Sequence, residues 1–325
     1  MKYPTTQRHI DHTRRTLLIA GLAAPKALMA PRPGDAHAQQ TPGVGDKEIR
    51  LGTWMPMTGP LKAYGVPLRA GIEADMHMIN DRGGIKGRKF ALTVEDNAYN
   101  AQRTLAIARK LVTRDDVYAI VAPLGTAQTA AAFDYLFGEA KVPLLNPYGG
   151  TVNWYVPPRE NLYGVQAPYE GQARALGRWA MKDGHKSLIV LHTALMGYDN
   201  VAVHVAPGAK SLRPDAAVEL FGTKFGATDY GPISLDLIQK KPDAVVLIVA
   251  QGEVIAASKE LRTQGYKGDL YTYSPSVSSC LLELGGAALE GIKSVSWIVP
   301  VTTNNAAVKE YRDALAKYSP GEKPD

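Results

Sequence analysis

Cysteine is almost absent from this chain. Cys280 is the only one among 325 residues. A single thiol cannot form an internal disulfide, and no cysteine stands beside the N-terminal segment where a lipid could be attached. We therefore expect neither a disulfide nor a lipid-anchored cysteine, and we expect Cys280 to lie in a structural element as a small apolar residue.

The sequence also lacks the motifs of nucleotide-dependent and hydrolytic enzymes. Neither G-x-G-x-x-G nor G-x-x-x-x-G-K-[ST] occurs, and no G-x-S-x-G elbow is present. His192 and His204 have neither metal-ligand spacing nor a companion set of cysteines or carboxylates, so we interpret both as structural residues. The absence of a catalytic constellation predicts a protein that is not an enzyme and that needs no metal and no cofactor.

Long apolar runs and clusters of positive charge are missing from the body of the chain. After residue 38, no apolar run reaches the length of about 18 residues that a membrane span needs. The first 38 residues hold six basic and two acidic residues of the totals of 37 and 31, which leaves 31 Lys and Arg against 29 Asp and Glu. A nearly neutral chain without a basic cluster is unsuited to phosphate backbones, so we exclude nucleic acid as a partner and expect a soluble globular body.

The N-terminus has the three parts of an export signal. Basic residues end in Arg14-Arg15, an apolar run covers residues 16–24, and Ala36-His37-Ala38 is an A-x-A cleavage site. The paired arginines indicate a twin-arginine signal, and an ordinary secretory signal remains the alternative. Residues 1–38 are therefore predicted to direct export to the periplasm, with cleavage near Ala38.

From residue 47 onward, short β-rich runs alternate with helical runs. Strands are predicted near 49–54, 90–94, 117–121, 142–145, 187–191, 217–221, 244–249, 270–273 and 292–299. Helices are predicted near 68–79, 101–111, 130–137, 171–181, 200–210, 234–240, 254–263, 278–284 and 306–317. Such alternation is typical of an α/β fold with parallel sheets covered by helices.

The alternation falls into two series, which predict two flavodoxin-like lobes. We assign residues 47–165 to the first lobe, 166–291 to the second, and 292–325 to a return towards the first, with crossing segments near 163–167 and 291–295. Open α/β sheets bind ligands beyond the carboxyl ends of their strands. Two lobes that face each other therefore predict a ligand cleft between them, closed by hinge motion.

Two polar turns after predicted strands are candidate ligand-binding segments. Residues 123–129, with Gly125 and Thr126, open into a helix whose unpaired amides suit a carboxylate or carbonyl oxygen. The alternative is that Thr126 only caps the helix. Residues 146–151 contain glycines that let the backbone approach a ligand, and a plain loop is the alternative. Tyr64 and Tyr198 could form flat walls, although any one of 16 tyrosines is more often a packing residue.

Several motifs resemble a known family. They are Ile49-Arg50-Leu51-Gly52, Thr58-Gly59-Pro60, Tyr64-Gly65, Gly71-Ile72-Glu73, Glu95-Asp96-Asn97, Val142-Pro143, Asn146-Pro147 and, most specifically, the I-N-x-x-G-G-I-x-G run of Ile79 to Gly87. The chain resembles the leucine/isoleucine/valine type of periplasmic binding protein, the receptor of branched-chain amino-acid ABC importers. The resemblance extends from about residue 47 to the end and is stronger in the first half.

The resemblance implies a type I periplasmic-binding-protein fold and a set of binding residues. In the first lobe, Gly125, Thr126, Tyr148, Gly149 and Thr151 match turns that hold a ligand carboxylate, with Tyr64 as an aromatic wall. In the second lobe, Tyr198 matches a ligand-binding tyrosine, and Gln251 and Ser276 lie in the following turns.

One departure from the family concerns the ligand's ammonium group. Amino-acid binders of this type place a glutamate where this chain reads Ser274-Pro275-Ser276-Val277. A buried ammonium without a partner is costly, so we expect a ligand without an α-amino group, such as an aromatic or aliphatic carboxylate. Asp199 is the alternative source of the missing charge.

The second departure is length. Family members usually continue past residues 311–318, whereas this sequence stops at Pro324-Asp325, so we expect either a truncation or a loss of C-terminal elements.

These observations predict an extracytoplasmic solute-binding receptor that delivers a small carboxylate-bearing molecule to an inner-membrane ABC permease, as a monomer. A periplasmic sensor for a signalling receptor and an exported α/β enzyme are the alternatives.

Overall fold

The structure is a computed structural model that describes residues 41–195 and 197–324. The predicted export signal therefore lies outside the described residues.

The first sheet contains five parallel strands in the order β2-β1-β3-β4-β5. Its strands are β1 (Glu48–Met55), β2 (Lys89–Asp96), β3 (Ala119–Val121), β4 (Leu144–Leu145) and β5 (Leu162–Tyr163). In β1, Leu51 pairs with Leu92 of β2 on one side and with Ala119 of β3 on the other. The first strand therefore lies inside the sheet, with β2 on one side of it and β3 to β5 on the other. This is the flavodoxin-type strand order.

The second sheet repeats this arrangement with the order β10-β9-β8-β6-β7. Its parallel strands are β6 (Ser187–Thr193), β7 (Ala217–Thr223), β8 (Ala244–Ile248), β9 (Asp269–Thr272) and β10 (Lys293–Ser294). Every residue of β8 is buried, as its uninterrupted apolar sequence predicts for a central parallel strand. The prediction of two parallel-sheet α/β lobes of the same topology is confirmed.

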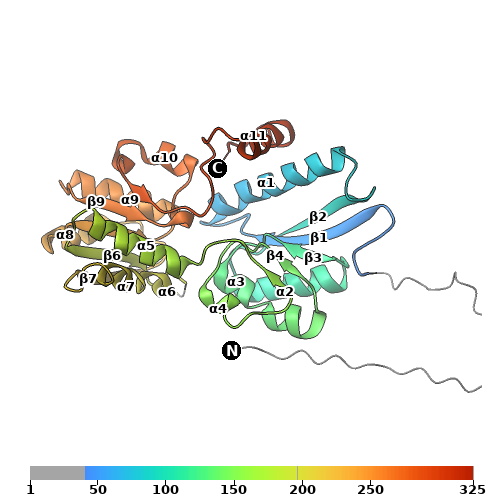
Figure 1. Cartoon of the computed structure of the whole chain (residues 1–325), viewed down its shortest axis with the longest axis horizontal. Helices are drawn as coiled ribbons and strands as arrows, with labels where there is room; N and C mark the ends of the chain where they lie inside the picture. Colours follow the sequence, from blue (N-terminus) through green and yellow to red (C-terminus); the bar gives the residue numbers. More distant parts are fainter. Residues whose placement is uncertain (1–40, 196, 325) are drawn as a thin grey trace, which may run out of the picture. The chain divides into compact units, whose positions relative to one another are not determined.

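Helices cover both faces of the first sheet. They are α1 (Lys62–Asp81), α2 (Ala101–Thr113), α3 (Thr126–Ala130), the π-helix η1 (Asp134–Ala140) and α4 (Val152–Tyr155). Figure 1 shows α1 on the opposite side of the sheet from α2 and α3. The main core of this lobe joins the buried Ile107, Ala108 and Leu111 of α2 to Trp54 and Ile120 of the sheet.

The second sheet is covered by α5 (Tyr169–Lys182), α6 (Asp199–Ala202), α7 (Val205–Lys210), α8 (Gly231–Gln239), α9 (Gln251–Thr263), the 3-10 turn η2 (Ser274–Ser276), α10 (Ser279–Gly285) and the 3-10 turn η3 (Gly286–Leu289). The last helix, α11 (Ala306–Tyr318), packs beside α1 through Ala70, Ala74, Ala314 and Leu315 (Figure 1). An ion pair of 2.7 Å between Arg82 and Glu310 also joins these two helices. Across residues 41–195 and 197–324, none of the helices combines the length and apolar character needed to cross a bilayer.

The expected strand at 292–299 is wrong in its length, because β10 contains only Lys293–Ser294. These two residues pair with Tyr271 and Thr272, and β9 ends at Thr272. Beyond that point the neighbouring strand offers no further backbone partners, so the alternating apolar residues up to Val299 line a cavity instead of extending the sheet.

Two helices also differ from their predictions. The helix expected at 200–210 is split into α6 and α7. Pro207 lacks the N–H that would bond to the carbonyl of Val203, and its ring clashes with that carbonyl, so the break falls at Val203 and His204. The helix expected at 130–137 begins earlier, at Thr126, and continues as the π-helix η1. Cys280 does lie on a helix, α10, but it is exposed and contributes little to a core.

Candidate ligand-binding site

A cavity of about 130 Å³ lies between residues that follow the strands of both sheets. Its walls come from segments far apart in the sequence. The lining residues are Leu61, Tyr64, Tyr99, Leu124, Gly125, Thr126, Ala127, Gln128, Tyr148, Tyr169, Leu195, Gly197, Tyr198, Tyr273 and Pro275. We call it the tyrosine cavity, because six of these residues are tyrosines.

The fold explains why these residues meet. In the first lobe, Tyr64 follows β1, Tyr99 follows β2 and Tyr148 follows β4. In the second lobe, Tyr198 follows β6 and Tyr273 follows β9. Parallel strands end at one edge of their sheet, and the reversal of strand order beside β1 opens a crevice at that edge. The tyrosine cavity therefore lies where this fold is expected to bind ligands.

Asn97 holds the first-lobe turns that carry Tyr99. Its side chain is fully buried and donates to Thr104 Oγ1 at 3.1 Å, while its Oδ1 accepts from the Tyr99 amide at 3.0 Å. Ala98 and Tyr99 have φ values of 45° and 56°, which side chains larger than glycine rarely adopt. The Asn97 hydrogen bond stabilises this turn and so sets the direction of the Tyr99 ring.

The start of α3 forms another wall of the tyrosine cavity. Trp54 of β1 donates to Thr129 Oγ1 at 3.2 Å, which fixes the helix against the sheet. The amides of Thr126, Ala127 and Gln128 begin the helix and have no intrahelical acceptor, so they are available to an oxygen-bearing ligand. Gly149 approaches them closely, because a Cβ at this position would lie 2.9 Å from Thr126 Oγ1.

Glu253 plays the corresponding role in the second lobe. It is 6% exposed and accepts from Thr193 Oγ1 at 2.7 Å and from the amides of Gly226 and Ala250 at 3.0 Å each. Thr193 is the last residue of β6, and Gly226 and Ala250 lie in the segments that follow β7 and β8. The carboxylate thus holds three turns together, and both of its oxygens are already occupied.

The hydrogen bond between Gln251 and Tyr64 joins the two lobes at the wall of the tyrosine cavity. The amide of Gln251, the first residue of α9, donates to Tyr64 Oη at 2.9 Å. This amide has no acceptor within its own helix, so the tyrosine hydroxyl satisfies it from the opposite lobe. Tyr64 and Tyr148 also line a larger cavity of about 630 Å³, which extends along α1 to residues 295–301 and α11.

The walls of the tyrosine cavity are uncharged. Burial raises the pKa of Tyr99 to about 12. Burial also raises the pKa values of Tyr64, Tyr169, Tyr198 and Tyr273, so these hydroxyls are neutral at physiological pH. Among the described residues of the lining, none is an acid or base other than tyrosine. The site can donate and accept hydrogen bonds, but it offers no carboxylate to an ammonium group.

The tyrosine cavity contains five of the nine residues predicted from the sequence, namely Tyr64, Gly125, Thr126, Tyr148 and Tyr198. Gln251 contacts Tyr64 at the wall and lines the larger cavity. The other three bond to the protein itself. The Gly149 amide donates to Gln166 Oε1 at 3.0 Å, Thr151 Oγ1 donates to Glu170, and Ser276 Oγ donates to the Val249 carbonyl.

Sequence reasoning missed four polar or aromatic lining residues, which are Tyr99, Gln128, Tyr169 and Tyr273. Three are tyrosines at the ends of strands or crossing segments. Tyr99 follows the strand predicted at 90–94 and Tyr273 ends the one predicted at 270–273, so their place at the ends of strands was the available signal. Gln128 gave no such signal, because its exposure to the cavity depends on how α3 packs.

The structure also locates the alternative source of negative charge, Asp199. Its carboxylate lies 2.9 Å from His192 Nδ1 and does not belong to the described lining of the tyrosine cavity. The histidine that we interpret as structural thus pairs with the acid that could have replaced the family's glutamate.

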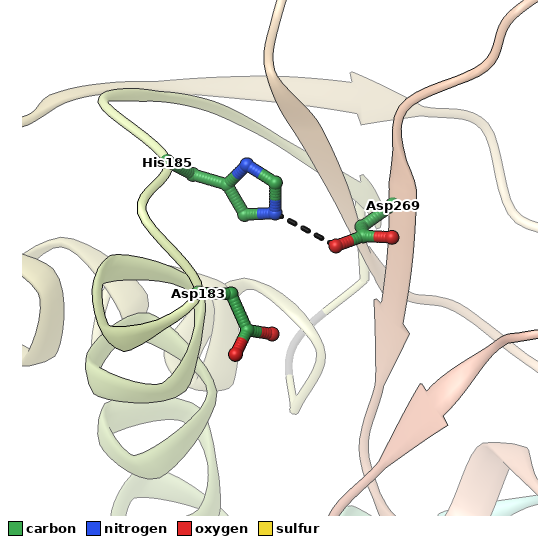
Figure 2. Close-up of side chains that lie close together, drawn as sticks. All are labelled: Asp183, His185 and Asp269. Carbon is green, nitrogen blue, oxygen red and sulfur yellow. Dashed lines mark hydrogen bonds and ion pairs between the residues drawn. The ribbon is translucent and has the colours of Figure 1, made fainter.

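Asp183, His185 and Asp269 form a cluster with the donor atoms of a metal site (Figure 2). His185 Nε2 lies 2.8 Å from Asp269 Oδ2. Lys293 Nζ lies 2.7 Å from a carboxylate oxygen of each aspartate, so an ammonium already provides the positive charge between them. We interpret this group as an ion-pair cluster that ties β10 to β9 and to the end of α5.

A cavity between two like lobes is the arrangement of a solute-binding protein. The family model described as periplasmic binding protein matches residues 48–325. The chain belongs to this family, and its resemblance to the leucine/isoleucine/valine-binding type is confirmed by its similarity to Leu/Ile/Val-binding protein homologs.

Individual relatives are distant. The chain is 23% identical over 274 residues to Leu/Ile/Val-binding protein homolog 1 of Brucella suis biovar 1 (strain 1330), which covers 82% of this chain and 72% of the relative. A possible leucine/isoleucine/valine-binding protein from Rhodopirellula baltica SH 1 has a TM-score of 0.77 at 18% identity, covering 88% of this chain and 78% of that one. A solute-binding protein of an ABC transporter from R. palustris, in complex with 4-hydroxybenzoate, has a TM-score of 0.74 at 18% identity, covering 85% and 74%.

Proposed function

We propose that this chain is the receptor of an ABC importer and binds a small carboxylate that has no α-amino group. The observation that carries the proposal is the tyrosine cavity, whose described lining contains no acidic side chain. An α-amino acid would bury an ammonium there without a counter-charge, and a lone buried cation is strongly disfavoured.

The size of the cavity supports a small guest. Its volume is about 130 Å³, and an apolar cavity of about 150 Å³ accommodates benzene. A single ring with a carboxylate, or a branched chain of similar volume, would therefore fill the space. The six tyrosines provide flat apolar surfaces for such a guest, and their hydroxyls provide hydrogen bonds.

The amides at the start of α3 would hold the carboxylate. Three consecutive N–H groups there lack intrahelical acceptors, and the helix end carries a partial positive charge. The hydrogen bond from the Gln251 amide to Tyr64 Oη would close the second lobe over the ligand. The closed form would then present both lobes to a permease in the inner membrane.

The related protein from R. palustris supports an aromatic acid as one candidate, since its ligand is 4-hydroxybenzoate. The test is isothermal titration of residues 39–325 with leucine and with 4-methylpentanoate, which is leucine without its amino group. Benzoate is titrated in parallel. We expect at least one of the two acids to bind and leucine to bind about tenfold more weakly or not at all. Tight leucine binding would overturn the proposal, and conversion of the acid, followed by NMR, would indicate an enzyme instead.

A further inference from the structure

Glu170 is a buried acid whose hydrogen bonds cross from one lobe to the other. It lies in the first turn of α5, in the second lobe, and is 7% exposed. Thr151 Oγ1 donates to its carboxylate, and the Val152 amide donates to both carboxylate oxygens at 3.2 Å each. The two donors stand at the start of α4 in the first lobe. We call Glu170, Thr151 and Val152 the interlobe clasp.

Two further hydrogen bonds place the interlobe clasp beside the first crossing segment. The Gly149 amide donates to Gln166 Oε1 at 3.0 Å, and the Tyr169 amide donates to the Gly150 carbonyl at 3.3 Å. Residues 149–152 therefore run alongside residues 166–170, through which the chain enters α5. The carboxylate belongs to one lobe and its donors to the other, so a rotation between the lobes changes the distance that separates them.

The interlobe clasp also adjoins two walls of the tyrosine cavity. Tyr169 directly precedes Glu170, and its ring packs edge-on against Tyr273 with centroids 5.6 Å apart. Tyr148 precedes Thr151 by three residues and lines the cavity from the first lobe. The clasp therefore fixes the spacing of cavity walls that come from opposite lobes.

The chemistry of a buried carboxylate makes this clasp depend on closure. A carboxylate that loses its water is strongly disfavoured unless hydrogen-bond donors replace that water. Among the described residues, the donors to Glu170 come from the first lobe alone. In an open form water would solvate the carboxylate, and on closure the hydroxyl and the amide would take its place. The clasp therefore contributes to the closed state rather than to the fold of either lobe.

We propose that Glu170 is a positioning residue for lobe closure, which binds Thr151 and Val152 when the second lobe closes on the first. Glu170 does not belong to the described lining of the tyrosine cavity, so it acts on the solute through Tyr148 and Tyr169. This inference rests on the proposed function, because closure is measured through the binding of a solute.

The experiment titrates residues 39–325 with 4-methylpentanoate and with benzoate, and measures dissociation by stopped-flow displacement. Thr151→Val removes the hydroxyl donor and leaves the buried carboxylate short of one bond in the closed form. We expect it to bind the acid about fivefold more weakly than the wild type, mainly through faster dissociation. Thr151→Ser keeps the hydroxyl and should bind within about twofold of the wild type. In a Glu170→Met background, Thr151→Val should change the affinity by less than about twofold, because the acceptor is already absent.

Thr272→Val is the matched control. Thr272 is fully buried, and its hydroxyl donates to the Leu247 carbonyl at 2.8 Å within the second lobe. This variant should lower the melting temperature and leave the affinity unchanged.

Three results would overturn the role of Glu170 and leave the proposed function standing: Thr151→Val binds as tightly as the wild type, Thr272→Val weakens binding equally, or Thr151→Val loses the same factor without Glu170. If Glu170→Met fails to fold, the comparison of Thr151→Val with Thr151→Ser and Thr272→Val still decides. If the wild type binds neither acid, the proposed function and this inference both fall.

Discussion

Replacing Tyr64 by phenylalanine tests whether the hydrogen bond between the lobes contributes to ligand binding. The change removes one buried oxygen and keeps the ring that lines the cavity. In the closed form, the Gln251 amide would then lose an acceptor at 2.9 Å. In an open form, water can satisfy the same amide. The loss is therefore expected to fall on the closed, ligand-bound state.

The magnitude follows from the usual net value of one hydrogen bond, about 0.5–1.5 kcal/mol. This free energy corresponds to a dissociation constant about 2–10 times higher, because about 1.4 kcal/mol is a factor of ten. The effect should appear mainly in the dissociation rate, since the bond forms after the ligand is enclosed. Stopped-flow displacement of the bound acid measures that rate, and calorimetry measures the affinity.

Tyr266→Phe provides the matched control. Tyr266 Oη, unlike Tyr64 Oη, is the donor of its bond to the backbone, which runs to the Pro242 carbonyl at 3.2 Å, and both residues belong to the second lobe. This variant should lower the melting temperature and leave the affinity unchanged. If Tyr64→Phe bound ligand as tightly as the wild type, or if Tyr266→Phe weakened binding equally, the bond between the lobes would have no part in closure.

Three further predictions concern the surroundings of the site. Asn97→Ala should lower the free energy of unfolding, measured by urea denaturation, by about 2 kcal/mol, and it should weaken ligand binding because the Tyr99 turn loses its support. Asn97→Asp keeps the acceptor for the Tyr99 amide, so this variant should bind the ligand better than Asn97→Ala. Lys293→Met should lower the free energy of unfolding by about 1 kcal/mol at pH 7, because Lys293 holds the pKa values of Asp183 and Asp269 below their usual range. A carboxyl group with a lowered pKa stabilises the folded state at pH values above its unfolded pKa of about 3.9. The difference in unfolding free energy between Lys293→Met and the wild type should therefore shrink as the pH falls below about 4. A difference that stays constant with pH would contradict the role of Lys293 in this cluster. Burial raises the pKa of Tyr99 to about 12, so its neutral side chain stabilises the fold fully below pH about 10, the unfolded pKa of tyrosine. This contribution should fall as the pH rises from about 10 to about 12. Thermal melts across this pH range measure the effect.

Much of the fold follows from patterns that act over short distances. The apolar run of β8 and the helical spacing of α2 each specify an element, because burial of one face or one strand depends on nearby residues. A local rule also explains the break between α6 and α7, because Pro207 disfavours a continuous helix whatever lies around it. The I-N-x-x-G-G-I-x-G run indicates the family, and the fold of that family implies the order of the strands.

Tertiary structure alone decided which side chains meet in the cavity. Tyr99, Gln128 and Tyr273 lie on three separate segments, and only the parallel sheets bring the ends of these segments together. The same holds for Asp199, the alternative source of negative charge, because His192 of β6 pairs with its carboxylate. Sequence patterns could predict that a ligand cleft exists, because strand order and turn chemistry are local or inherited from the family. The polarity of that cleft depends on which side chains from distant segments come together, and no local sequence pattern predicts this.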